Sequence, residues 1–75
     1  NNYPQAQYNL GAIYFEGKFI QKDITKGINY LIKASDNNNV DAQYALGDLY
    51  EQGRCVTKNI NKAIKYYSLA ANKKI

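Results

Sequence analysis

The side chains that most often perform catalysis are scarce in this sequence. It contains no histidine and a single cysteine, Cys55. Without a histidine or a second thiol, the sequence offers no base to activate that cysteine and no ligand set for a zinc site. The six carboxylates are scattered, whereas acid–base catalysis would need a pair in an apolar cleft. We therefore expect no enzymatic activity, no metal site and no cofactor.

Charge and tyrosine content point instead toward binding. The chain has 75 residues, eight tyrosines and a net charge of +4. A lone thiol cannot form an intrachain disulfide, which slightly favours a reducing compartment such as the cytoplasm. No stretch resembles a signal peptide, and the apolar runs are too short to cross a bilayer, so we expect no membrane partner. A domain of this size usually needs a neighbour to be stable.

The sequence repeats itself with a period of 36 residues. Residues 6–17 read AQYNLGAIYFEG and residues 42–53 read AQYALGDLYEQG, and thirteen positions are identical between 6–39 and 42–75. Such a period indicates a solenoid, and apolar residues three and four positions apart favour helices over strands. We predict two helix-turn-helix units, 1–39 and 40–75, cut from a longer array.

Each unit is predicted to contain two helices. Leu10 is placed in the core, and the apolar stripes of the first helices are Ala6, Leu10, Ile13, Tyr14 and Ala42, Leu46, Leu49, Tyr50. Gly17 and Gly53 should end these helices in the left-handed conformation. Asp23 and Asn59 should cap the second helices, whose stripes are Ile24, Ile28, Leu31, Ala34 and Ile60, Ile64, Tyr67, Ala71.

Two glycines are expected inside the first helices. Gly11 and Gly47 each cost about 1 kcal/mol relative to alanine at such positions. A close approach of the second helix of the same unit would compensate, with Ala34 and Ala70 as the small facing residues. We interpret both glycines as packing residues and not as parts of a ligand site.

These motifs resemble a known family. The pattern A-x-x-x-L-G-x-x-Y-x-x-G, a loop ending in a cap, and K-A-x-x-Y-x-x-A-A is similar to the Sel-1-like repeat, a relative of the tetratricopeptide repeat. The resemblance implies an all-α, right-handed α/α superhelix of antiparallel helix pairs that acts as a scaffold for protein complexes. Gly27 stands where the second unit has Ala63, which should loosen that helix. Asn59 replaces the acidic cap, and the cysteine pairs of a secreted branch of the family are absent.

The resemblance also implies a binding face. By analogy with tetratricopeptide arrays, the first helix of each unit lines the concave side, and residues opposite Leu10 meet a partner. The predicted partner-binding residues are Gln5, Tyr8, Asn9, Ala12, Phe15, Asp41, Tyr44, Asp48 and Glu51, with Glu16, Ala45 and Gln52 on the same face. Tyr8, Tyr44 and Phe15 would be anchors. Tyr8 and Tyr44 have an equally good alternative role in packing between the units.

The distribution of charge predicts the kind of partner. Residues 4–16 and 40–52 contain four carboxylates and no lysine or arginine, whereas the remainder contains all ten basic residues with only Asp23 and Asp36. We therefore expect a neutral to acidic concave side that binds a neutral or basic peptide rather than an acidic tail. The lysines are interpreted as a solvated outer face.

Two other functions stay open as alternatives. Helical repeats also bind RNA, but the basic residues are expected on a different side from the predicted groove, so we expect no nucleic-acid partner. A weak hydrolase of the cysteine-rich branch is the second alternative, although Cys55 aligns with Phe19 and is expected in a semi-buried packing position. The last helix is apolar nearly all round, so we expect neighbouring repeats or self-association to cover it.

Overall fold

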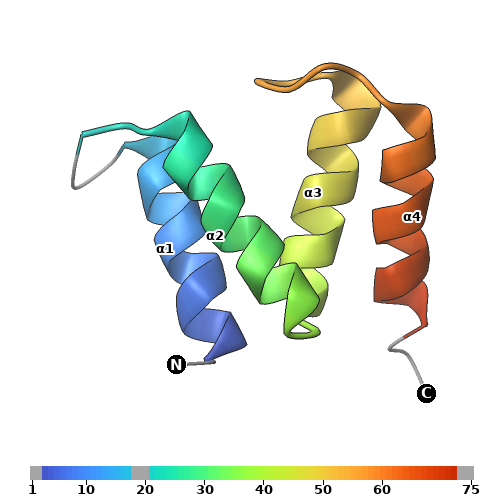
Figure 1. Ribbon diagram of the computed structural model, residues 1–75, viewed down its shortest axis with the longest axis horizontal. Coiled ribbons are helices and arrows are strands. Elements are labelled where there is room, and N and C mark those ends of the chain that lie inside the picture. Colours follow the sequence, from blue (N-terminus) through green and yellow to red (C-terminus); the bar gives the residue numbers. More distant parts are fainter. Residues whose placement is uncertain (1–2, 18–20, 73–75) are drawn as a thin grey trace.

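The computed structural model describes residues 3–17 and 21–72, and within these ranges the only regular elements are helices. The four helices are α1 (Pro4–Glu16), α2 (Ile24–Asp36), α3 (Val40–Gln52) and α4 (Ile60–Ala71). Figure 1 shows them side by side in chain order, with α1 beside α2 and α3 beside α4. The prediction of an all-α solenoid of two helix pairs is confirmed.

Glycines end the first helix of each pair. Gly17 has a φ of 65° and Gly53 a φ of 70°, so both lie in the left-handed region. Their N–H groups donate to Ile13 O at 2.9 Å and to Leu49 O at 2.8 Å. These bonds satisfy carbonyls at the helix ends and turn the chain into the loop that leads to the second helix.

Side-chain caps begin α2, α3 and α4. Asp23 and Asn59 each accept a hydrogen bond at 3.0 Å from the backbone N–H three residues later, and Asn39 does the same at 2.8 Å. The N–H of Asp23 also donates to Tyr14 O at 2.9 Å, and the N–H of Asn59 donates to Tyr50 O at 3.0 Å. These bonds hold the start of each second helix against the end of its first helix.

The two helices of the first pair approach each other through glycines on both. A Cβ at Gly11 would lie 2.9 Å from Gly27 O, and a Cβ at Gly27 would lie 2.8 Å from Gly11 O and 2.9 Å from Phe15 N. The expected close approach is present, but Gly27 and Leu31 face Gly11, not Ala34. Gly27 therefore permits a contact between backbones, which the expectation of a merely loosened helix missed.

The second pair uses a different contact at the same place. A Cβ at Gly47 would lie 2.9 Å from the ring of Tyr67, so this ring, rather than Ala70, faces the glycine. Tyr67 occupies the position of Leu31 in the first pair. Because Gly47 has no side chain, the ring of Tyr67 from α4 can pack directly against the backbone of α3.

The core lies mainly between the two pairs, where α2 packs against α3. Its buried apolar residues are Leu31, Ala34, Ala42, Leu46 and Leu49. Gln43 of α3 is 1% exposed, and its Nε2 donates a hydrogen bond to Ser35 O of α2 at 3.2 Å.

The prediction that Leu10 lies in the core is wrong. Leu10 is 39% exposed, whereas Leu46, its counterpart in the second pair, is 0% exposed. The difference arises because α2 covers α3 at this position, and no described element covers α1 in the same way.

The outer face of α4 is open for the corresponding reason. Ile60 and Ile64 are 48% and 57% exposed, whereas their counterparts Ile24 and Ile28 are half-buried, and Ile28 packs against the core cluster. The chain therefore presents an apolar face on α1 and another on α4, and each has a covered counterpart inside the molecule.

Candidate functional site

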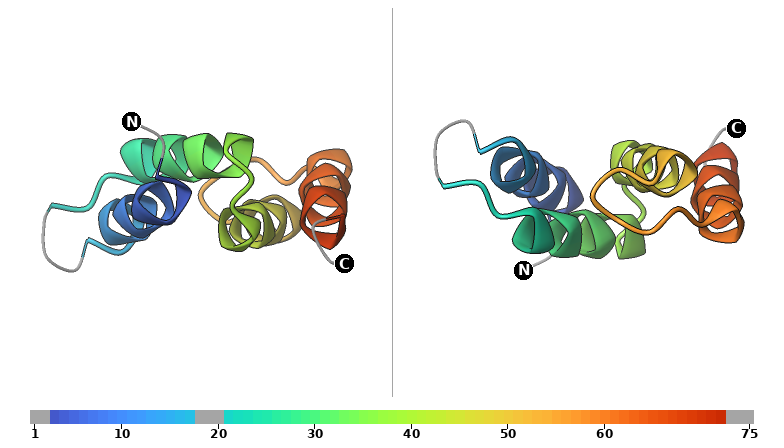
Figure 2. Two further views of the ribbon diagram at one scale, coloured as in Figure 1. Left: turned by 90° about the horizontal axis from the view of Figure 1, so that it is seen from below. Right: turned by 90° about the horizontal axis from the view of Figure 1, so that it is seen from above.

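The first helices of both pairs lie on the same side of the molecule. Figure 2 shows α1 and α3 together on one side and α2 on the other. We call this side the α1/α3 face. The nine predicted partner-binding residues all belong to α1 or α3, and they are Gln5, Tyr8, Asn9, Ala12, Phe15, Asp41, Tyr44, Asp48 and Glu51. Tyr44 is 45% exposed, whereas Tyr8 and Phe15 are half-buried and pack against the core cluster.

A hollow of about 420 Å³ lies on the α1/α3 face. We call it the tyrosine hollow, and it is lined by Tyr8, Asp41, Tyr44, Ala45, Asp48 and Tyr67. Four of the nine predicted residues thus meet at one place, and they come from both pairs. Gln5, Asn9, Ala12, Phe15 and Glu51 are not among its lining residues.

The hollow also includes Tyr67 of α4, which sequence reasoning assigned to an apolar stripe. Its ring lies 6.0 Å from that of Tyr44, centroid to centroid, at an interplanar angle of 58°. The residue at its place in the first pair is Leu31, and a leucine gives no hint of a surface role. The glycine that makes room for this ring, Gly47, gave no signal either, because Gly11 stands in the same sequence context and faces Leu31.

Hydrogen bonds orient the polar groups around the hollow. Tyr67 donates its hydroxyl proton to Glu51 Oε1 at 2.8 Å. This bond, together with partial burial and the charges of Glu51 and Asp48, raises the pKa of Tyr67 to about 12. Asp48 accepts from Gln52 Nε2 at 2.9 Å, and its Oδ2 lies 3.8 Å from Arg54 Nη1. The residues that line the hollow include two carboxylates and no lysine or arginine.

A polar cluster joins the two pairs at one end of the α1/α3 face. Gln5 Nε2 donates to Asn9 Oδ1 at 3.3 Å, and Gln5 Oε1 accepts from Asn39 Nδ2 at 3.2 Å. Asn37 Nδ2 donates to Gln7 Oε1 at 3.0 Å nearby. Gln5 and Gln7 therefore help to hold α1 against the turn between α2 and α3, and Asn9 bonds to Gln5 within α1.

Four other tyrosines form two equivalent stacked pairs, one between the two helices of each repeat. Tyr14 and Tyr30 lie 5.8 Å apart at an interplanar angle of 8°, and Tyr50 and Tyr66 lie 6.0 Å apart at 6°. A lysine ammonium lies 5.0–5.6 Å from each of the four rings; these lysines are Lys26, Lys33, Lys62 and Lys65. The expectation that aromatic and basic residues occupy different sides is therefore wrong for these stacks.

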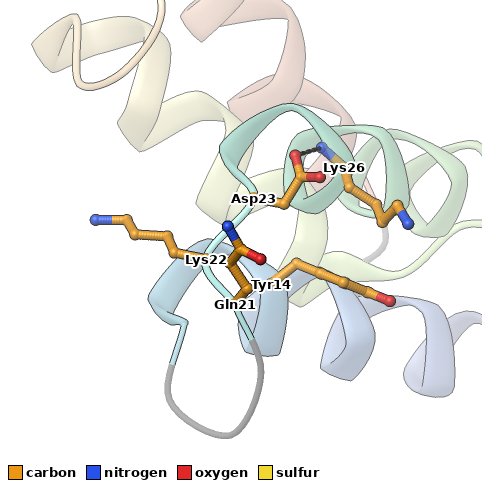
Figure 3. Close-up of a pocket in the computed structure, with 5 residues that line it drawn as sticks. All are labelled: Tyr14, Gln21, Lys22, Asp23 and Lys26. Atoms are coloured by element: carbon orange, nitrogen blue, oxygen red, sulfur yellow. Dashed lines mark hydrogen bonds between the residues drawn. The ribbon is translucent and has the colours of Figure 1, made fainter.

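A second hollow, of about 390 Å³, lies beside the first interhelix loop (Figure 3). It is lined by Tyr14, Gln21, Lys22, Asp23 and Lys26. The carboxylate of Asp23 is already engaged as the cap of α2, and the Lys26 ammonium lies 5.0 Å from the Tyr14 ring centroid. Asp23 and Lys26 of this second hollow thus already have contacts within the fold.

Chemistry other than binding finds little support in the described residues. Cys55 is exposed with a φ of 62°, so the prediction of a semi-buried packing position is wrong; Phe19, with which it was aligned, lies outside the described residues. Within residues 3–17 and 21–72, no cluster of three potential metal ligands is present. None of the helices in these ranges is long and apolar enough to cross a membrane.

Comparisons with known proteins agree with this architecture. A crystal structure of a Sel1 repeat protein from Oxalobacter formigenes matches with a TM-score of 0.89 and 39% identity, over 95% of this chain and 29% of that one. A protective antigen of uropathogenic Escherichia coli with an SLR fold matches with a TM-score of 0.88 and 32% identity, over 99% and 16% of the two chains.

A Sel1-like repeat-containing protein of Acanthamoeba polyphaga mimivirus is 47% identical over 34 residues, which are 45% of this chain and 6% of the viral protein. The chain thus spans less than a third of the length of each of these relatives. The family model for the Sel1 repeat matches twice in succession, at residues 4–39 and 40–74. Sel1 repeats generally form protein-interaction modules and are typically non-catalytic. With two consecutive repeats that span nearly all of its length, this chain belongs to the Sel1 repeat family.

Proposed function

We propose that this chain is a protein-interaction module that binds a segment of a partner protein across its α1/α3 face. The observation that carries the proposal is the tyrosine hollow, because it lies on that face and joins both repeats. Tyrosines supply large contact areas at low entropic cost, and they are enriched among the residues that dominate interface energies. Tyr44 is 45% exposed, so it is available to a partner.

The charge of this face selects the partner. Asp41, Asp48 and Glu51 border the hollow or lie beside it, and the helices α1 and α3 contribute no basic side chain. An acidic peptide would be repelled there, whereas a neutral or basic segment would not. The partner segment is therefore neutral or basic, in an extended or helical conformation.

The proposal is tested by selecting binders from a displayed library of random peptides and mapping one of them by NMR. We expect neutral or basic sequences that shift the amide signals of α1 and α3. Tyr44→Ala should weaken binding at least about 10-fold, as expected for an anchor. Lys65→Ala, on α4 and outside the tyrosine hollow, serves as the matched control and should leave binding unchanged. Acidic binders, or binders that shift only α2 and α4, would refute the proposal.

RNA is the weaker candidate, although lysines and tyrosines do meet in the two stacks. A base needs an open ring face on which to stack. Each of these rings already has a neighbouring ring and an ammonium against it. We therefore propose no nucleic-acid partner, and a salt-dependent gel shift with single-stranded RNA would contradict this.

The open apolar faces of α1 and α4 carry a second proposal, which concerns self-association. Inside the molecule, the α2 face with Ile28 packs against the core cluster that contains Leu46 of α3. The α4 face repeats the first pattern and the α1 face repeats the second. A second copy of this chain therefore fits head to tail, with its α1 against α4 of the first. Because such a contact is not closed by symmetry, association should continue beyond a dimer as the concentration rises.

A further inference from the structure

The tyrosine hollow combines two kinds of group that favour one kind of ligand. Tyr8, Tyr44 and Tyr67 contribute aromatic rings, and Asp41 and Asp48 contribute carboxylates. Aromatic faces and carboxylates both attract cations, whereas a purely apolar ligand would leave the carboxylates desolvated without a partner. The composition of the lining therefore points to a positively charged side chain.

The two carboxylates lie two helical turns apart on α3. Asp41 and Asp48 are separated by seven residues, which corresponds to a rise of about 10.5 Å along the helix. Both line the hollow, with Tyr44 between them in sequence. A side chain that enters between the two carboxylates would therefore lie against the Tyr44 ring.

The molecule already holds one arginine near this place. The guanidinium of Arg54 reaches back from the loop after α3, and its Nη1 lies 3.8 Å from Asp48 Oδ2, with 57% and 44% of the two side chains exposed. Such an exposed pair is weak and exchanges readily with another cation. Arg54 therefore acts as an internal competitor for a basic ligand at Asp48.

We infer that the tyrosine hollow takes a single arginine side chain of the partner protein. Arginine fits better than lysine because its planar guanidinium stacks on a tyrosine ring and donates to a carboxylate through two parallel N–H groups. The hollow volume of about 420 Å³ leaves room for such a side chain and for water. This inference rests on the proposed function, since it assigns the feature of the partner that the α1/α3 face selects.

The test uses two blocked tripeptides, N-acetyl-Gly-Arg-Gly-amide and the same peptide with citrulline, the neutral isostere of arginine. Titration of the isotopically labelled protein is followed by NMR at concentrations of each peptide up to about 10 mM, because one side chain binds weakly. We expect the arginine peptide to shift the amide signals of Asp41, Tyr44 and Asp48. The citrulline peptide should bind at least about 5-fold more weakly.

Two variants test the sign of the charge effect, a third is their control and a fourth tests the aromatic ring. Asp48→Asn should weaken binding of the arginine peptide by about 3- to 5-fold. Arg54→Gln should strengthen it by about 2- to 3-fold, since it removes the internal competitor and a repelling charge. Asp36→Asn, at the exposed end of α2 and outside the hollow, is the matched control and should leave binding unchanged. Tyr44→Phe should retain binding, because the aromatic ring is kept.

The inference is overturned if the arginine and citrulline peptides bind equally, or if Arg54→Gln weakens binding of the arginine peptide. It is also overturned if neither peptide shifts the NMR amide signals of Asp41, Tyr44 and Asp48. Its failure is distinguishable from failure of the proposed function. Library-selected peptides that shift α1 and α3 while the arginine peptide does not would remove the inference and keep the function. An arginine peptide that binds in the hollow while all selected peptides bind elsewhere would refute the proposed function and leave arginine binding by the hollow standing.

Discussion

Replacing Gly27 by alanine separates two opposite expectations. The second repeat has Ala63 at this position, and alanine is favoured over glycine inside a helix by about 1 kcal/mol. Repeat logic alone therefore predicts that Gly27→Ala stabilises the protein. The structure predicts the opposite, because the new Cβ would lie 2.8 Å from Gly11 O and 2.9 Å from Phe15 N.

The magnitude follows from what the new methyl group meets. Both close atoms belong to the backbone of α1, so no side-chain rotation relieves the contact and the two helices must separate. Overpacking of this kind costs about 1–3 kcal/mol, and a contact with two backbone atoms belongs at the upper end. After the gain in helix propensity, we expect a net loss of about 1–2 kcal/mol, which lowers Tm by about 4–8 °C per kcal/mol in a domain of this size.

The assay is thermal and urea unfolding followed by far-ultraviolet circular dichroism. Thr25→Ala, at an exposed position of the same helix, is the matched control, because it reports the propensity gain without the contact. The control should be stabilised by a few tenths of a kcal/mol while Gly27→Ala is destabilised. An increase of Tm in Gly27→Ala would refute the close helix contact that we describe.

Three further predictions concern the site, the caps and the open faces. Tyr67→Phe should remove the ionisation step near pH 12 from a tyrosinate absorbance titration, because the hydrogen bond to Glu51 raises the pKa of Tyr67 to about 12. The contribution of this raised pKa to the free energy of unfolding should be complete below pH 10.0 and lost as the pH rises toward 12. Asp23→Ala should cost about 1 kcal/mol in urea unfolding, since it removes the side-chain cap of α2, and a change below a few tenths would contradict that role. Leu10→Lys and Ile64→Lys should each abolish concentration-dependent association in sedimentation experiments, whereas a mixture of the two should form a heterodimer; a mixture that stays monomeric would exclude head-to-tail contact.

The helices and their ends could be predicted from the sequence because their signals are local. Gly17 and Gly53 follow apolar stripes of helical spacing, and both adopt the left-handed conformation that ends a helix. Asp23 and Asn59 precede the next stripes and accept hydrogen bonds from backbone N–H groups. Each of these features depends on residues within a few positions, so one sequence contains the information.

Burial could not be predicted in the same way, because it depends on how many neighbours a helix has. Leu10 and Leu46 are identical residues at equivalent positions, yet they are 39% and 0% exposed. The pattern assigns both to the core, and only the arrangement of the helices distinguishes them. The same reason explains why Ile64 is exposed while Ile28 is half-buried.

The lysine–tyrosine contacts were missed for another reason. When charges are counted along the sequence, each charge is assigned to the helix that carries the residue. A lysine side chain, however, can extend along the surface to a ring on the neighbouring helix. Lys26 of α2 thus lies over Tyr14 of α1, and Lys62 of α4 over Tyr50 of α3. Their recurrence in both repeats, at 5.0 and 5.1 Å, indicates that they contribute to the fold of each repeat.

The positions at which the two repeats differ account for the chemistry of the tyrosine hollow. Asp41, Asp48 and Tyr67 stand where the first repeat has Gln5, Ala12 and Leu31, so the negative charges and the third ring occur once. Residues shared by both repeats, such as the glycines that end the first helices, determine the backbone and recur with the period of 36. A solenoid of identical units would present the same surface at every step and could not bind a partner in one register. On the inference that the hollow takes an arginine, the departures on α3 and α4 are what would give this pair of repeats one position for that side chain.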